Sequence, residues 1–493
     1  MTLSASAKGA LVSSRKDTPL LLAAGAVLLL AVTLLLWPAL RAVPVWDDLY
    51  SLIAIDVTAS RGRPTIAATG DLIGFWRPAE LWLNAVLRPL DPDALLPVKL
   101  VSLGLHALKV AALVALVRRV APAVPARYAY VAGFVALVHP IAVSAIIQID
   151  TVSEALAAAA IAWALAFVLD AMQHEGRARH TRLAGVAVCC AIALLGKESA
   201  LPAVMAMPLA GFVAASSRRK AVPDLVKLGV VLAALCFALL AARYALGYGR
   251  PAADDGRYQI GFGINVVKNL LTVVGSLAFL GNTVSLINDR HATALLGFVP
   301  VLLGLLVVCR ALLFRREAFL STYDLPTSLA CALVALAATS APALAPMISE
   351  HNTALPSGAF LAAVLGAVAA AAFVDTPRGR SLAALAAVLA IVSGLVAMRD
   401  KANAAAGVGK IVAETRDAIT ALALKQEHVR VCIVPEDGRA YSIYRLAAQR
   451  WMPEEILWAQ HRFPGKDISY VTEQSGPDCD LSVPDFATAD PSR

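Results

Sequence analysis

Charged residues are scarce in this sequence. Asp, Glu, Lys and Arg make up only 16% of its 493 residues, whereas a soluble domain keeps about 25% charged residues because its surface faces water. The shortage excludes an ordinary water-soluble protein. Hydrophobic residues make up 59%, and apolar stretches of roughly 20 residues, long enough to cross ~30 Å of hydrocarbon as helices, recur along the chain. The composition predicts an all-α polytopic membrane protein.

Nucleotide-binding and metalloprotease motifs are also missing. The sequence has no Walker loop, no dinucleotide fingerprint and no HExxH motif, which argues against an ATP-driven pump. The net charge is +8, but the basic residues lie in small clusters between the apolar stretches, as they do in membrane proteins. No nucleic-acid partner is therefore expected.

Cysteines are few, and only two of them lie in polar sequence. Cys432 and Cys479 lie in the C-terminal tail and can form a disulfide if that tail is outside the cell membrane. The alternative is two unpaired thiols. The other five cysteines lie in apolar stretches and are expected to pack as small hydrophobic residues: Cys189, Cys190, Cys236, Cys309 and Cys331.

About eleven membrane spans are predicted from the apolar stretches. They fall near 19–41, 96–117, 127–147, 153–171, 183–196, 199–216, 224–246, 292–313, 326–346, 356–375 and 381–398. Residues 1–18 are expected to be a cytoplasmic, basic lead into a retained anchor, with no cleavable signal peptide. Residues 264–286 are apolar enough for a twelfth span, which would place Arg315 and Arg316 outside. An interfacial or re-entrant segment is therefore favoured there.

The basic residues of the short loops predict the orientation. They all fall on one side if the N-terminus is cytoplasmic: Lys8, Arg15, Lys16, Arg118, Arg119, Arg127, Arg177, Arg179, Arg182, Arg218, Arg219, Lys220, Arg315, Arg316, Arg378 and Arg380. The short loops on the other side, around 148–152 and 347–355, carry no Lys or Arg. The transmembrane domain then spans 19–398, with outer loops at 42–95 and 247–291, in what we expect to be a bacterial inner (plasma) membrane.

The tail from 399 to 493 is predicted to be a small extracytoplasmic α/β domain. A helix is expected near 405–425, where apolar residues recur on one face. The strand-like run HVRVCIV follows, then a helix around 441–451 and a second strand at ISYVT.

An acidic pair directly follows the first predicted span. Asp47 and Asp48 stand in the segment VWDDLYSL. One carboxylate can act as a general base, its pKa raised by its neighbour. Together the two can instead bind a divalent cation such as Mg²⁺ or Mn²⁺, which prefers oxygen ligands. A third interpretation is a solvated helix end.

A polar stripe marks the first outer loop. Arg77, Glu80, Asn84 and Arg88 recur at spacings of three and four in WRPAELWLNAVLR, so they share one face of an otherwise apolar helix. Pro78 suits the first turn of that helix. Such a helix is expected to lie flat in the membrane interface.

Other charged residues stand at the ends of spans, where burial near lipid requires a partner or a function. Lys197 and Glu198 lie in a turn between two apolar stretches. Lys197 can bind a phosphate as a point charge, or the two can form a self-neutralising pair. Glu350 and His351 lie in an outer loop, as candidates for binding or as ordinary loop residues.

A histidine lies inside the third predicted span. His139 stands in FVALVHPIAVSAIIQIDTVSEAL, which has Asp150 and Glu154 at its outer end. A histidine within a helix is either a binding residue or a structural hydrogen-bonding residue, and His106 in LGLHALKV falls in the same category.

The order of these motifs resembles the GT-C glycosyltransferases. The resemblance rests on an acidic pair after the first span, Arg-Pro in the first outer loop, a His in the second span and His-Pro in the third. Lys-Glu after the fifth span and Leu-Pro-Ser-x-x-Phe in a late span extend it over roughly residues 19–375. The most similar branches are protein O-mannosyltransferases (family 39-like), tetratricopeptide-linked O-mannosyltransferases and lipid A aminoarabinose transferases.

The resemblance implies transfer of a sugar from a polyprenyl phosphate to an acceptor at the outer face of the membrane, usually with inversion. Asp47 or Asp48 would be the general base. Arg77, Lys197 and His351 would stabilise the departing phosphate, and Glu350 would orient the acceptor or a basic partner. His139, in the His-Pro motif, and Glu198, in Lys-Glu, would belong to the substrate site. The acceptor would be a lipid, a glycan or a protein.

The sequence departs from the family pattern at two places. Ser144 stands where relatives often carry an acidic residue after His-Pro, and Glu350-His351-Asn352 replaces a common Glu-Arg-Tyr. Two other functions compete with the transferase: a secondary transporter, which would need charges near the bilayer midplane and an internal repeat, and a non-enzymatic scaffold of the cell envelope.

Overall fold

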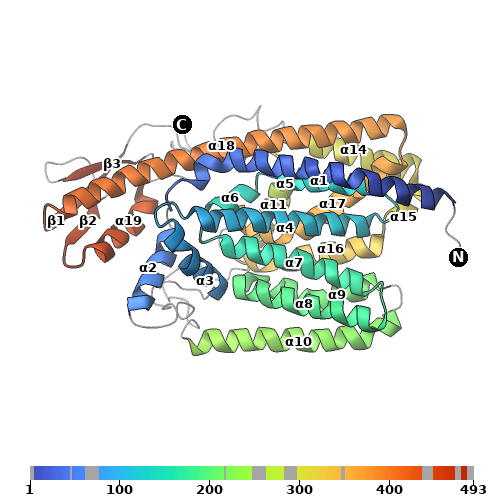
Figure 1. The fold of residues 1–493 in the computed structure, drawn as a ribbon, viewed down its shortest axis with the longest axis horizontal. Helices are drawn as coiled ribbons and strands as arrows, with labels where there is room; N and C mark the ends of the chain where they lie inside the picture. Colours follow the sequence, from blue (N-terminus) through green and yellow to red (C-terminus); the bar gives the residue numbers. More distant parts are fainter. Residues whose placement is uncertain are drawn as a thin grey trace.

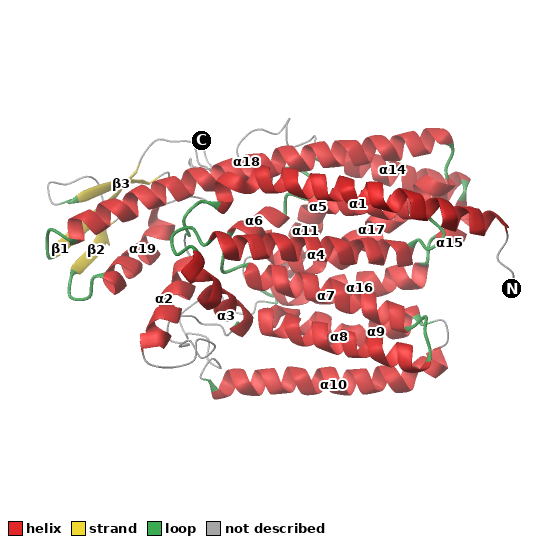
Figure 2. Ribbon diagram, in the orientation of Figure 1, coloured by secondary structure: helices red, strands yellow, loops and turns green. Residues whose placement is uncertain are grey.

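A bundle of long helices with a small sheet at one end makes up the computed structural model of the chain (Figure 1). The structure describes residues 5–44, 47–60, 77–215, 218–246, 262–281, 297–345, 350–435, 448–471 and 479–485. Figure 2 shows how little of it is strand, since helices account for nearly all of the regular structure. The predicted all-α membrane domain with a small α/β part is confirmed.

Eight helices of the described residues are long and apolar enough to cross a membrane. They lie in α1 (Ala5–Leu40), α4 (Leu96–Val120), α7 (Val152–Ala171), α8 (Gly176–Gly196), α10 (Arg218–Ala245), α16 (Leu325–Ala343), α17 (Ala354–Val374) and α18 (Pro377–Ala423). Each of the eight coincides with a predicted span. The chain is therefore a multi-pass membrane protein.

Three of the eleven predicted spans fall on shorter helices instead. The span at 199–216 is α9 (Leu201–Ala214), and the span at 292–313 is α14 (Val299–Phe314). The prediction of one continuous helix over 127–147 is wrong. The helix α5 (Ala126–Leu137) ends before His139-Pro140, and the short helix α6 (Ala142–Ile147) begins after it. Proline has no N–H to continue the helix, and it disfavours helical backbone at the preceding residue.

The segment 264–286, for which the sequence left a twelfth span open, contains α11 (Ile264–Ala278), which has 15 residues. At 1.5 Å per residue it is about 22 Å long, too short for a ~30 Å hydrocarbon core. The Asn269 amide donates to the backbone oxygens of Ala343 (3.1 Å) and Ala345 (2.8 Å) at the end of α16. This helix therefore lies against the end of α16, and a re-entrant or interfacial placement stays a prediction.

The elements outside the bundle gather at its two ends (Figure 1). At the left end are α2 (Asp47–Ser60), α3 (Pro78–Leu87) and the C-terminal sheet. The N-terminus and the short helix α15 (Arg316–Thr322) are at the right end. The chain enters α4 at the left end, so Arg118 and Arg119 in its last turn fall at the right end. The segregation of the basic loops is thus a property of the fold.

The C-terminal sheet is small and entirely parallel. Its strands are β1 (His428–Pro435), β2 (Asp467–Val471) and β3 (Leu481–Asp485), in the order β2-β1-β3. Parallel neighbours need a crossover connection, and α19 (Ala448–Arg462) provides it between β1 and β2. The sequence predicted β1 and β2 at these places but not β3.

Two predicted helices of this region differ in the structure. The helix near 405–425 is not separate from the last span, since α18 runs unbroken for 47 residues from Pro377 to Ala423. No proline interrupts α18 after its first residue, so nothing ends the helix between the two apolar patterns. The helix predicted around 441–451 is α19; it continues to Arg462, and residues 441–447 lie outside the described residues.

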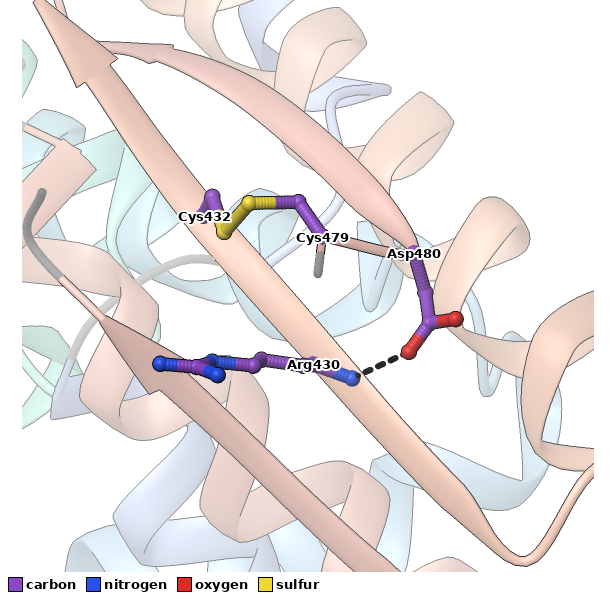
Figure 3. Close-up of a disulfide and its surroundings, with 4 residues drawn as sticks. All are labelled: Arg430, Cys432, Cys479 and Asp480. Carbon is purple, nitrogen blue, oxygen red and sulfur yellow. Dashed lines mark hydrogen bonds between the residues drawn. A yellow bond between two sulfur atoms is a disulfide. The ribbon is translucent and has the colours of Figure 1, made fainter. Parts of the chain in front are cut away.

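A disulfide joins β1 to the residues that precede β3. It links Cys432 and Cys479, whose Cα atoms are 5.8 Å apart (Figure 3). Beside it the Arg430 backbone N–H donates to the Asp480 carboxylate over 2.8 Å. The sequence left open whether Cys432 and Cys479 form a disulfide or stay free thiols, and in this structure they form the disulfide.

Candidate active site

A buried ion pair lies at the end of the bundle that carries α2 and α3. Lys197, the residue after α8, binds Glu154 in the first turn of α7, and both side chains are almost fully buried. The Ser153 hydroxyl donates to the other Glu154 oxygen over 2.8 Å. Charges removed from water in this way are stabilised only by partners of this kind.

Arg77 extends this pair into a cluster. It immediately precedes Pro78, the first residue of α3, and is buried. Its guanidinium lies 3.5 Å from Glu80 and 3.5 Å from Glu198. Burial alone would lower the pKa of Arg77, but the carboxylates of Glu198, Glu154 and Glu80 together raise it above its ordinary value. The Arg77 side chain is therefore a permanent cation.

His351 brings a fourth segment to the cluster. It lies in the 3-10 turn η5 (Glu350–Thr353), directly before α17, and its Nε2 is 3.8 Å from Glu154 Oε1. Glu350 begins the same turn, although its side chain lies outside the described residues. Of the predicted site residues, Arg77, Lys197, Glu198 and His351 thus come together.

The acidic pair is placed by its backbone only. Asp47 and Asp48 are the first two residues of α2, and their side chains lie outside the described residues. Leu49, the next residue, is buried in one hydrophobic cluster with Ile149 and Val152, which flank Asp150 at the start of α7. Packing therefore brings the beginning of α2 to the end of α7 that carries Glu154.

His139 is placed elsewhere. Its ring contacts the backbone of Ile141, the residue before α6, and that of Leu277 in α11. The Ile141 N–H donates to Nδ1 over 3.3 Å, and Nε2 lies 3.1 Å from the Leu277 oxygen. Since Nδ1 accepts, the neutral ring carries its hydrogen on Nε2 and donates to Leu277. His139 thus ties the break between α5 and α6 to α11.

Glu154 is the main residue of the cluster for which the sequence predicted no role. It contacts both Lys197 and His351 and therefore lies at the centre of the cluster. Glu80 and Asp150 belong to the same surroundings, since both act on the charge of Arg77. The signals in the sequence were the polar stripe on α3 and the two acidic residues after His139. Glu198 binds Arg77 and Glu154 binds Lys197, so each of these cations is held by a carboxylate.

Within the described ranges, no three or more His, Cys, Asp or Glu side chains are grouped so as to hold a metal ion. The side chains of the predicted ligands, Asp47 and Asp48, lie outside those ranges. A site for Mg²⁺ or Mn²⁺ stays a proposal for this pair.

The C-terminal α19 contacts the same end of the bundle. Arg416 of α18 binds both oxygens of Glu455 in α19 (2.7 and 2.8 Å). Arg416 also donates to the Pro44 oxygen over 3.0 Å, three residues before Asp47. Asp56 of α2 binds Arg88 with both oxygens (2.7 and 3.1 Å). The sheet domain thereby adjoins the beginning of α2.

Comparison with solved structures identifies the same architecture elsewhere. ArnT, an aminoarabinose transferase, from Cupriavidus metallidurans in its apo state has a TM-score of 0.53 with 15% identity, over 91% of this chain and 89% of that chain. The same protein bound to undecaprenyl phosphate gives 0.53 with 16% identity, over 91% and 90%. The predicted GT-C-type fold is confirmed by this likeness.

No protein-family model matches the sequence, and a search of curated proteins by sequence finds no match.

Proposed function

We propose that this chain is a glycosyltransferase that moves a sugar from a polyprenyl-phosphate donor to an acceptor hydroxyl at the outer face of the membrane. The observation that carries the proposal is the convergence of Arg77, Lys197 and His351, from separate segments, at the end of the bundle where α2 begins. The fold adds support, because ArnT with this architecture was solved with undecaprenyl phosphate bound.

In the proposed reaction Asp47 or Asp48 accepts the proton of the acceptor hydroxyl. The hydroxyl oxygen attacks the anomeric carbon of the sugar, and the bond between that carbon and the phosphate oxygen breaks. Attack opposite to the leaving group inverts the anomeric centre. The departing polyprenyl phosphate takes the bonding electrons, so negative charge develops on it in the transition state.

Arg77 and Lys197, with His351, would stabilise that developing charge. Glu198 and Glu154 already hold the two cations in place, so little reorganisation is required when the phosphate leaves. The phosphate would share each cation with its carboxylate. Glu350 would orient the acceptor, which is a lipid, a glycan or a protein. We place the protein in a bacterial inner membrane with its N-terminus cytoplasmic and its C-terminal domain outside.

The test compares envelope glycans and lipid-linked sugars of a deletion strain with those of strains that carry variants of the chain. Mass spectrometry should show loss of one glycan modification in the deletion strain. We expect D47N or D48N to lose the modification as well, by about 100-fold or more in rate, the usual contribution of a positioned general base. D93N is a matched control, since Asp93 is an exposed carboxylate in the same outer loop.

A transporter or a scaffold predicts other results. If the variants at Asp47 and Asp48 insert normally and leave every glycan unchanged, the transferase proposal is wrong. A scaffold would tolerate both substitutions. A transporter would instead show altered uptake or export with glycans intact.

A further inference from the structure

A cavity lies within the bundle, away from the charged cluster. It has a volume of about 840 Å³ and lies between α5, α14, α17 and α18, partly open to the outside. Alanine, valine and leucine side chains make up most of its wall, and His139 is at one end of it. In the part of the chain described here, its polar lining is confined to two arginines, two tyrosines and that histidine.

The length of the cavity corresponds to one leaflet of a bilayer. Along α17 it is lined from Phe360 to Ala372 and along α18 from Arg380 to Ala390. At 1.5 Å per residue these stretches measure about 18 Å and about 15 Å. The hydrocarbon core is ~30 Å thick, so one leaflet contributes about 15 Å. The cavity therefore reaches from the membrane interface to the middle of the bundle.

Its interfacial end is cationic. Arg127 and Arg380 line it and are both exposed. Arg127 lies over the ring of Tyr128, 5.6 Å from its centroid, and Arg380 donates to the backbone oxygen of Phe373 over 3.2 Å. Neither arginine has a carboxylate partner among the described residues.

Asp375, the acidic residue nearest to Arg380 in sequence, does not neutralise the cationic end of the cavity. Asp375 is buried and binds Arg310 (3.3 Å) and the Thr376 N–H (2.7 Å). The two tyrosines of the lining, Tyr128 and Tyr323, are side chains that favour the membrane interface. The end thus has the composition of a headgroup site.

An apolar space of this size does not stay empty at low free energy, because its walls lose their dispersion contacts. Inside a membrane the molecules at hand to fill it are lipids. We propose that the cavity binds one anionic glycerophospholipid from the leaflet at the N-terminal end of the bundle. Its phosphate lies between Arg127 and Arg380, and its acyl chains occupy the space that ends at His139.

This lipid is distinct from the proposed sugar donor. The two arginines belong to the end of the bundle with the N-terminus, where α5 and α18 begin, whereas Arg77, Lys197 and His351 lie at the opposite end beside α2 and α3 (Figure 1). The inference is therefore independent of the proposed function.

The test is native mass spectrometry of the purified full-length chain released from nanodiscs of phosphatidylglycerol and phosphatidylcholine in equal amounts. We expect one retained phosphatidylglycerol on the wild type. The double variant R127Q/R380Q should retain it about 30-fold less, as the loss of two arginine–lipid attractions predicts. R378Q is the matched control, since Arg378 is two residues from Arg380 and does not line the cavity. It should retain the lipid as the wild type does.

A second variant tests the chains rather than the headgroup. A387F fills the cavity from α18 and should reduce retention of the same lipid, while thermal unfolding checks that it still folds. Equal retention of both lipids by the wild type, or unchanged retention in R127Q/R380Q, would overturn the proposal. So would displacement of the lipid by added undecaprenyl phosphate, which would assign the cavity to an isoprenoid chain.

Discussion

The pair of Lys197 and Glu154 determines what single substitutions do at the charged end. Both side chains are less than a tenth exposed. A buried ion pair contributes little net stability, because desolvation offsets most of the attraction between the charges. Removing only one partner is different, since the other charge is then left in low dielectric without compensation.

We therefore expect E154Q to lower the free energy of unfolding by about 3–5 kcal/mol. Unfolding of the purified protein in detergent, followed by circular dichroism, measures this. The double variant E154Q/K197Q should be less destabilised than the sum of the two single variants, because it leaves no unpaired charge.

An exposed pair provides the control for this prediction. Lys220 and Glu175 are 3.2 Å apart with both side chains mostly exposed, so K220Q should change the free energy of unfolding by less than about 1 kcal/mol. Equal effects of E154Q and K220Q would show that burial does not govern the cluster.

At the scale of elements, the disulfide holds a short strand in the sheet. The bridge between Cys432 and Cys479 closes a loop with a sequence separation of 47 residues, which contains α19 and β2. Closing a loop of this length removes conformational entropy from the unfolded chain. The strands themselves are short, with five residues each in β2 and β3.

Replacing both cysteines, as C432S/C479S, should therefore lower the stability of the sheet domain by up to about 4 kcal/mol, the chain-entropy value for such a loop. Limited proteolysis should then cut first between β1 and β3. The eight helices that can cross the membrane should stay protected in the same digest. Unchanged proteolysis of the C-terminal region would contradict this role of the bridge.

The whole molecule has two chemically different ends, and their placement is open to a direct measurement. In chains whose native free cysteines are replaced, Q173C probes the end with the basic loops and E427C probes the end with the sheet. Both positions are exposed. A maleimide that does not cross membranes should label E427C in intact cells and Q173C only after lysis. The reverse pattern would invert the predicted orientation.

The sequence predicted the membrane class, because hydrophobic length is a local property of the chain. It also singled out Lys197 and Glu198, since charged residues in a tight apolar turn require a partner or a ligand. His139 shows what this reasoning leaves open. A histidine inside an apolar run looks the same in sequence whether it binds a substrate or a backbone oxygen, and the sequence could not predict that its ring contacts the Leu277 oxygen of α11.

Glu154 illustrates a second limit. Its sequence neighbours are ordinary helix residues, and its importance arises from Lys197, 43 residues later, and from His351 in another turn. Arg416 and Glu455 are of the same kind, 39 residues apart on different helices. Pairs so far apart in sequence produce no periodic pattern in a single sequence. They could be found only from the way the helices pack in the structure.

The unbroken helix α18 has a mechanical consequence. Its 47 residues form a rod about 70 Å long that begins beside α15 and ends beside the sheet (Figure 1). Because each residue turns a helix by about 100°, inserting a single alanine halfway along would swing Arg416 away from Pro44 without altering one side chain. The number of residues in this continuous helix therefore determines the direction about the helix axis in which the sheet domain faces α2.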